Sequence, residues 1–128
     1  MATEKMGIKI ETNPDETKLT SLGVRSWPKW EGPPSTFPWT FTSNETCYLL
    51  KGKVKVTPDG YNDFVEIGAG DLVVFPKGMK CTWEISEAVD KHYNMFLLSL
   101  LLFVSLILLI LSGGDVLQAN SHGHKSER

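Results

Sequence analysis

Residue types and charge patterns that often indicate a function are scarce in these 128 residues. The chain has only three histidines and two cysteines, Cys47 and Cys81, which leaves few side chains for a transition-metal site or a disulfide framework. It has 13 basic and 15 acidic residues and a net charge of −2, without a basic block that would attract a phosphate backbone. The composition therefore argues against nucleic acid as a partner and leaves a small globular domain.

A leader sequence is also missing from the first residues. Residues 1–18 have neither the apolar core of a secretory signal nor the arginine-rich character of a transit peptide. We therefore expect the folded part to lie in the cytosol, with Cys47 and Cys81 as thiols rather than a structural disulfide. A redox pair between the two is a lesser alternative.

Long hydrophobic runs are absent except for one, Met95 to Leu111, which contains no charged side chain. At about 1.5 Å per residue this run covers roughly 25 Å, close to the thickness of a thin hydrocarbon core. We therefore predict a single-pass transmembrane helix over residues 95–111, in an ER-like membrane rather than the plasma membrane. A buried core helix and an artefact of the gene sequence are the alternatives.

The stretch between Val24 and Asn94 alternates short β-prone runs with glycine- and proline-rich turns. No amphipathic helix is visible there. Residues 53–56 alternate lysine and valine, which predicts a strand with one wet face. The pattern predicts an all-β domain with eight strands, at Gly23–Ser26, Trp39–Thr42, Thr46–Lys51, Lys53–Pro58, Asp63–Ile67, Asp71–Phe75, Lys80–Ile85 and Asp90–Asn94.

Two glycine-anchored motifs follow one another in this stretch. The first, ETCYLLKG, runs from Glu45 to Gly52, and the second, GDLVVFPKG, runs from Gly70 to Gly78. We expect Gly52 to close a tight hairpin and Pro76-Lys77-Gly78 to turn the chain into the next strand. In order and spacing the two motifs resemble the paired motifs of the cupin superfamily.

Within that superfamily, the segments WTFTSNETCYLLKGKVKV and GAGDLVVFPKGMKCTWE resemble the small cupins named after the ureidoglycine aminohydrolase domain, which include short single-domain plant members. The resemblance implies a double-stranded β-helix, or jelly-roll, barrel over residues 5–94, preceded by an arm at residues 1–4. Dimerisation through edge strands is common in the superfamily, so it also implies a homodimer. The transmembrane helix at 95–111 and a polar, disordered tail at 112–128 lie outside the resemblance.

The resemblance also shows what this chain lacks. Metal-binding cupins carry histidines at the positions of Trp39, Phe41 and Cys81, with a glutamate at the position of Glu45. Three imidazoles are therefore missing, and we expect no tightly held metal or other cofactor. A divalent transition metal held by Glu45 and Cys81 is the weaker alternative.

Strand alternation in this register directs a set of side chains into the barrel: Trp39, Phe41, Glu45, Cys47, Leu49, Cys81, Trp83 and Ile85. We predict that Trp39, Phe41, Glu45, Cys47, Cys81 and Trp83 line a ligand pocket, although the aromatic members could equally be core. An ionised Glu45 inside such a barrel needs a partner such as Arg25 or Lys29, access to the open mouth, or a proton.

These features predict a membrane-anchored small cupin that binds a small organic ligand without a tightly held metal. The alternative is an aminohydrolase-like enzyme acting on a small nitrogen compound, with Glu45 as general base and Cys81 as nucleophile or auxiliary ligand. A non-catalytic interaction module is a third reading. His92 is expected at the surface, and His122 and His124 in the tail make a poor metal site.

Overall fold

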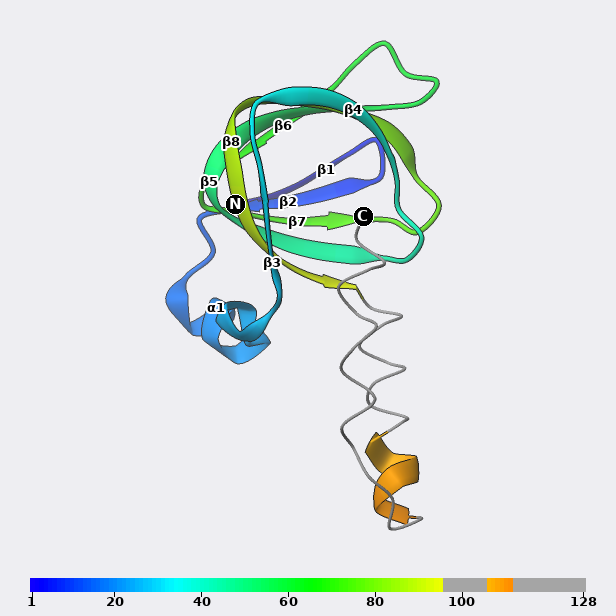
Figure 1. Ribbon diagram of the computed structural model, residues 1–128. Helices are drawn as coiled ribbons and strands as arrows, with labels where there is room; N and C mark the ends of the chain where they lie inside the picture. The colour runs from blue at the N-terminus through cyan, green and yellow to red at the C-terminus, as the bar shows by residue number, and fades with distance from the viewer. Residues whose placement is uncertain (96–105, 112–128) are drawn as a thin grey trace.

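The computed structural model describes residues 1–95 and 106–111. One sheet dominates it, and Figure 1 shows how the strands curve around a common interior. The expected all-β architecture is confirmed. The strands are β1 (Ala2–Lys5), β2 (Ile8–Thr12), β3 (Lys29–Gly32), β4 (Ser35–Thr40), β5 (Glu45–Pro58), β6 (Val65–Gly68), β7 (Asp71–Phe75) and β8 (Lys80–Met95).

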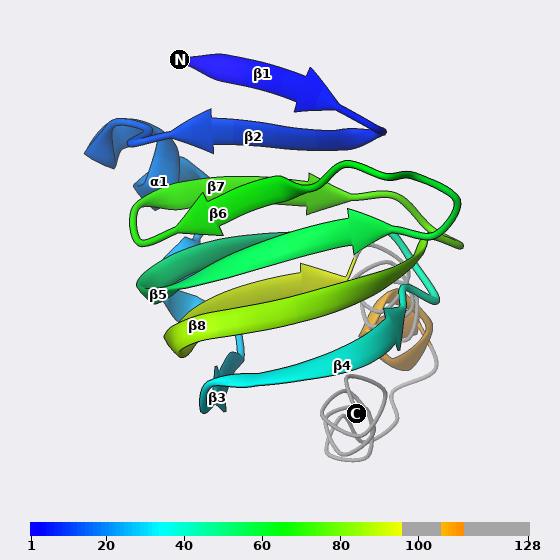
Figure 2. The ribbon, with the colours of Figure 1, turned by 90° about the horizontal axis from the view of Figure 1, so that it is seen from above.

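The strand order of this sheet is β1-β2-β7-β5-β8-β3, with β4 paired to β8 and β6 paired to β5, and every pairing is antiparallel. Figure 2 shows the same sequence of strands from above. The long strands β5 and β8 pair with each other over most of their length, from Glu45 opposite Met95 to Pro58 opposite Cys81. These two strands therefore form the central seam from which the site is built.

Each of these long strands replaces two of the predicted strands. The predicted hairpin at Gly52 is wrong, because Gly52 lies within β5 and the pairing with β8 shifts register around it. Its φ is +109°, and a Cβ there would lie 2.7 Å from the carbonyl oxygen of Ala88 and 2.8 Å from Cα of Val89. Glycine at this position thus permits a close approach of the two backbones rather than a chain reversal.

The second motif forms the turns that the sequence predicts. Gly70 follows β6 and leads into β7, whose bounds match the predicted strand. The N–H of Gly70 donates to the carbonyl of Leu49 at 2.8 Å. After β7, the N–H of Gly78 donates to the carbonyl of Phe41 at 2.7 Å. The first of these hydrogen bonds joins the two motifs, and the second fixes the turn at Gly78 against the segment that precedes β5.

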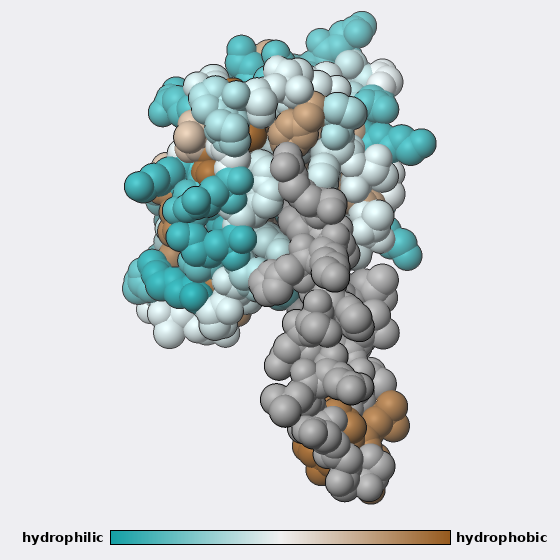
Figure 3. Space-filling view, viewed as in Figure 1, coloured by the Kyte–Doolittle hydropathy of each residue, from teal (hydrophilic) through white to brown (hydrophobic). Residues whose placement is uncertain are grey.

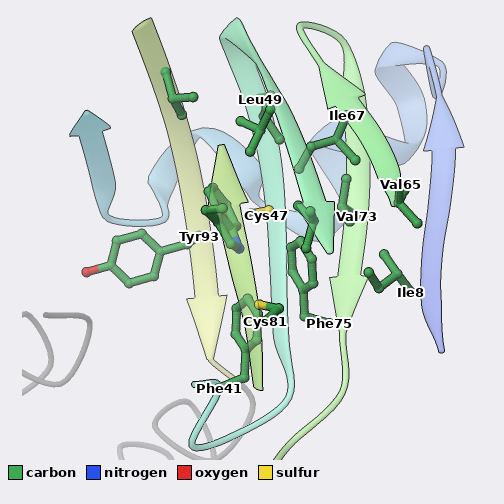
Figure 4. Close-up of a cluster of buried hydrophobic side chains, with 14 of the residues drawn as sticks. Ile8, Phe41, Cys47, Leu49, Val65, Ile67, Val73, Phe75, Cys81 and Tyr93 are labelled. Carbon is green, nitrogen blue, oxygen red and sulfur yellow. The ribbon is translucent and has the colours of Figure 1, made fainter. Parts of the chain in front are cut away.

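Hydrophobic side chains from β2, β5, β6, β7 and β8, together with Phe41, fill the interior of the sheet, as Figure 4 shows. Phe41 and Phe75 stack with ring centroids 4.4 Å apart and planes inclined by 10°. In β5, Val54 and Val56 are buried while Lys53 and Lys55 are exposed, which confirms the predicted one-sided strand. The core residues drawn and labelled are Ile8, Phe41, Cys47, Leu49, Val65, Ile67, Val73, Phe75, Cys81 and Tyr93.

The amino-terminal part of the chain differs from the prediction in several places. Helix α1 (Glu16–Leu22) begins after Asp15, whose side chain accepts a hydrogen bond from the N–H of Lys18, and ends at Gly23. The predicted strand Gly23–Ser26 is wrong, because Val24–Ser26 forms a short 3₁₀ turn. Strands β1, β2 and β3 were not predicted, and β1 covers most of the predicted arm at residues 1–4.

The predicted membrane helix falls mostly outside the described residues. Met95, the first residue of the apolar run, is the last residue of β8. Leu106 to Leu111 are helical and expose apolar side chains, seen as the brown group at the lower end of Figure 3. Among the described residues, no helix is long and apolar enough to cross a membrane.

The close approach at Gly52 gives a stability prediction. Gly52→Ala should lower the free energy of unfolding by about 3 kcal/mol or more, because a left-handed φ costs an alanine about 1–2 kcal/mol and the β8 backbone must also move. Gly78→Ala is the matched control: its φ is +88°, but no atom lies within 4 Å of the added Cβ, so only the left-handed cost applies. Urea unfolding of both variants measures the difference, and equal losses would contradict the close-approach explanation.

Candidate ligand-binding site

A buried ion pair lies inside the barrel. Nζ of Lys91 in β8 is 2.9 Å from Oε2 of Glu45 in β5, and the two side chains are each 3% exposed. Strand pairing places Glu45 opposite Met95 and Lys91 opposite Leu49, so both side chains come from the central seam. Burying either charge alone would be costly, and the partner within hydrogen-bond distance offsets that cost.

Aromatic rings surround the ammonium group of this pair. Nζ of Lys91 lies 5.0 Å from the ring centroid of Trp83, 5.4 Å from that of Trp30 and 5.8 Å from that of Tyr93. Each distance is within the range of a cation–π interaction, and such contacts strengthen when water is excluded. The ammonium is therefore held by one carboxylate and three ring systems.

A small aromatic cavity opens above the ammonium. Its lining residues are Trp30, Phe37, Trp39, Trp83 and Lys91. The space between these side chains, with the mouth included, is about 230 Å³, of which only about 10 Å³ is open to the centre of a water molecule. In this conformation the cavity holds about one water, so a ligand of several atoms must enter from the mouth and move the rings apart.

Gly32 shapes one wall of the aromatic cavity. A Cβ at this position would lie 2.4 Å from Cη2 of Trp30, so the indole of Trp30 folds back over the strand only because residue 32 has no side chain. Trp30 and Trp83 meet edge to face, with centroids 6.4 Å apart and planes inclined by 82°. In this conformation the two indoles pack edge to face in the cavity wall.

A second, polar cavity lies on the other side of Glu45. Its lining residues are Trp39, Thr40, Phe41, Thr42, Ser43, Glu45 and Met95, and about 10 Å³ is open to the centre of a water molecule. The hydroxyl of Ser43 is buried and has no hydrogen-bond partner within the described part of the chain. This cavity therefore has the size and the polar groups for one bound water or for the polar end of a ligand.

The two thiols are buried below the cavities and line neither of them. Burial raises the pKa of the Cys81 thiol to about 11, an effect partly offset by the side chain of Trp83. Its Sγ–H donates to the carbonyl of Trp39 at 3.6 Å. Cys81 is therefore protonated at neutral pH and has little thiolate character.

A divalent metal does not fit this donor set. Glu45 is already paired with the Lys91 ammonium, the Cys81 thiol is protonated, and indole and phenyl rings stand where imidazoles would be needed. Across residues 1–95 and 106–111, no group of three histidine, cysteine or acidic side chains is close enough to hold a metal ion. An ammonium fixed to the chain occupies the place beside the motif glutamate.

The structure distributes the predicted pocket residues between two cavities and the core. Trp39 and Trp83 line the aromatic cavity, Trp39, Phe41 and Glu45 line the polar one, and Cys47 and Cys81 lie in the core. Except for the half-buried Trp39, every residue predicted to point inward is buried. Sequence reasoning missed Trp30, Phe37 and Lys91 as lining residues, although β-strand alternation places Lys91 on the same face as Val89 and Tyr93.

Two predictions about polar side chains are corrected by the structure. The expected partner of Glu45 is present, but it is Lys91 and not Arg25 or Lys29, which form ion pairs with Glu16 and Asp90. Histidine 92 is not on the surface: His92 is 8% exposed, and its Nδ1–H donates to the carbonyl of Trp27 at 2.9 Å. The predicted tail histidines lie outside the described residues.

Comparison with known proteins identifies the family. Residues 19–93 match the model of the EutQ-like cupin domain, which is more than half of the chain. The chain belongs to this family of cupins. The resemblance drawn from the two glycine motifs is thus confirmed for the cupin fold, whereas its finer part, the likeness to ureidoglycine aminohydrolase and to plant members, stays a prediction.

One solved structure supports the family assignment. A DUF861 family protein from Thermotoga maritima is 49% identical, with a TM-score of 0.66, over 69% of this cupin and 98% of that chain. The EutQ protein of Clostridium difficile is 28% identical, with a TM-score of 0.46, over 51% of this chain and 50% of its own. A search of curated proteins found no match.

The buried ion pair gives the second prediction. Lys91→Met leaves a carboxylate buried without its partner and should cost about 3–5 kcal/mol of unfolding free energy, whereas the double variant Lys91→Met with Glu45→Leu should recover most of that loss. Lys53→Met, which breaks the exposed pair with Glu87, is the control and should cost less than about 1 kcal/mol. Urea unfolding measures all three. A double variant as unstable as Lys91→Met would contradict the prediction.

Proposed function

We propose that this cupin binds a small organic ligand in the aromatic cavity above the Lys91–Glu45 ion pair, without a tightly held metal. The observation that carries the proposal is the combination of ring faces and a buried, fully paired charge in one concave site. Ligand pockets typically have this character: mostly apolar walls with a few fixed polar groups. The ion pair supplies those polar groups, and Trp30, Phe37, Trp39 and Trp83 supply the walls.

Ring packing alone does not account for the site. A core filled only for stability would bury apolar side chains, since replacing a buried ion pair by hydrophobic residues is often neutral or stabilising. Trp30, Phe37 and Trp39 are also only half-buried at the mouth, so their rings are accessible to a ligand. A paired charge beneath accessible rings is better explained by recognition than by packing.

The alternative aminohydrolase gains no support from this geometry. The Cys81 thiol has a raised pKa and lines neither cavity, so it is a poor nucleophile. Glu45 is bound to Lys91, so it could act as a general base only if that pair separates. The hydrolase role of Glu45 and Cys81 therefore stays a prediction from the sequence.

A thermal-shift screen of small metabolites tests ligand binding. A ligand at 100 times its dissociation constant should add about 2.7 kcal/mol of stability. The shift should be lost in Trp39→Ala, which removes the wall shared by the two cavities, and kept in Trp27→Ala, which changes a tryptophan outside them. Stabilisation that survives Trp39→Ala, or its absence with every compound, would contradict binding in this cavity.

We also propose that the apolar run at residues 95–111 anchors the domain to a membrane. The support is the sequence itself, together with the helix at Leu106–Leu111, in which five of the six apolar side chains, all except Leu109, are 41% to 79% exposed. Exposed apolar side chains in such a group are typical of a surface that contacts a membrane or another protein.

Carbonate extraction of membranes that contain the full chain tests this anchoring. A spanning helix should keep the protein in the pellet, because the cost of exposing the apolar run to water does not depend on pH. The double variant Leu108→Arg with Ile110→Arg is the control and should release the protein. Release of the unmodified chain into the supernatant would contradict the anchor.

A further inference from the structure

The charges beneath the aromatic cavity are balanced before any ligand enters. Glu45 contributes one negative charge and Lys91 one positive charge, and the two lie 2.9 Å apart. Among the residues that line the cavity, Lys91 carries the only ionisable group, and this holds for the part of the chain that the structure describes. Because the charges beneath the aromatic walls cancel, the charge of a ligand decides how favourably it can bind.

A charged ligand would disturb this balance. An anion next to Lys91 would also meet the carboxylate of Glu45, whose Oε2 lies 2.9 Å from the ammonium, and would have to leave its hydration shell. A cation would be attracted by the ring faces, but three of these already face the ammonium of Lys91, and like charges a few ångströms apart repel. An uncharged ligand incurs neither cost.

The polar side-chain groups around the aromatic cavity are all hydrogen-bond donors. Trp30, Trp39 and Trp83 each carry an indole N–H, Lys91 carries an ammonium, and neither group can accept. The side chain of Trp83 already interacts with the Cys81 thiol in the core. An acceptor on the ligand is compatible with the remaining donors of this wall, whereas a donor on the ligand finds no acceptor among these lining side chains.

We propose that the ligand of this cavity is a flat, uncharged molecule that carries a hydrogen-bond acceptor, such as a carbonyl oxygen. The flat body packs against the indole and phenyl rings, and the acceptor takes hydrogen bonds from the donors on the cavity wall. This inference rests on the proposed function, because it specifies the chemistry of a ligand bound at that same site. It assigns Lys91 and Glu45 a role in excluding charged molecules.

Three isosteric probes test this: benzamide is neutral, benzoate is an anion and benzamidinium is a cation. The readout is the set of indole N–H signals of the full-length protein in ¹H–¹⁵N spectra, assigned with single Trp→Phe variants. Trp30, Trp39 and Trp83 line the cavity and Trp27 does not, so Trp27 is the internal control. Benzamide should shift the three cavity signals and leave Trp27 unchanged, while each ion should bind at least about tenfold more weakly.

Two substitutions should invert this preference. Glu45→Gln leaves the ammonium without its counter-charge and should favour benzoate over benzamide, whereas Lys91→Met leaves the carboxylate and should favour benzamidinium. The inversion identifies charge balance as the cause in a way that a general loss of binding would not. If either variant does not fold, the comparison of the three probes on the unmodified chain still tests whether the site prefers an uncharged ligand.

The outcomes separate the two proposals. If benzoate or benzamidinium binds the unmodified chain more tightly than benzamide and shifts the cavity signals, the uncharged-ligand inference is wrong and the binding function stands. If none of the three probes shifts a cavity signal, both proposals are contradicted. If all three bind equally well, the site recognises aromatic shape alone and charge balance has no role.

Discussion

The ion pair between Lys91 and Glu45 is the interaction on which the rest of the site depends. It joins the two central strands inside the barrel, 2.9 Å apart, with each side chain only 3% exposed. An isolated charge at this depth would cost several kcal/mol, so neither residue can be removed alone without a large loss of stability. The rings of Trp30, Trp83 and Tyr93 surround the ammonium, and those of Trp30 and Trp83 also line the cavity.

This pair also explains how a cupin can keep its motif glutamate without the histidines. The positive charge beside Glu45 is a side chain of the same molecule, so the site requires no ion from solution to remain electrically balanced. The charge of this site is fixed by the chain, so it does not vary with the supply of metal ions.

The sequence predicted the architecture well where periodicity was strong. The all-β class, β7 and the wet face at Lys53 and Lys55 follow from alternation and turn residues, which are local signals. It predicted badly where tertiary contacts decide: Gly52 resembles a turn but serves a close approach to β8, and Lys91 resembles a surface lysine until its pairing with β5 is known. Helix α1 was missed despite a local signal, the cap at Asp15 with Gly23 at the end.

The long pairing of β5 with β8 has a consequence for how the protein folds. Glu45 lies opposite Met95, so the seam joins residues far apart in the chain, and loops between them must close before these contacts form. Folding dominated by such distant pairings is slow. On the ribosome, the barrel cannot close until the last residues of β8 have been synthesised. Until then Glu45 lacks its counter-ion, and the aromatic rings have no ammonium group between them. The binding site is thus the final part of the domain to mature.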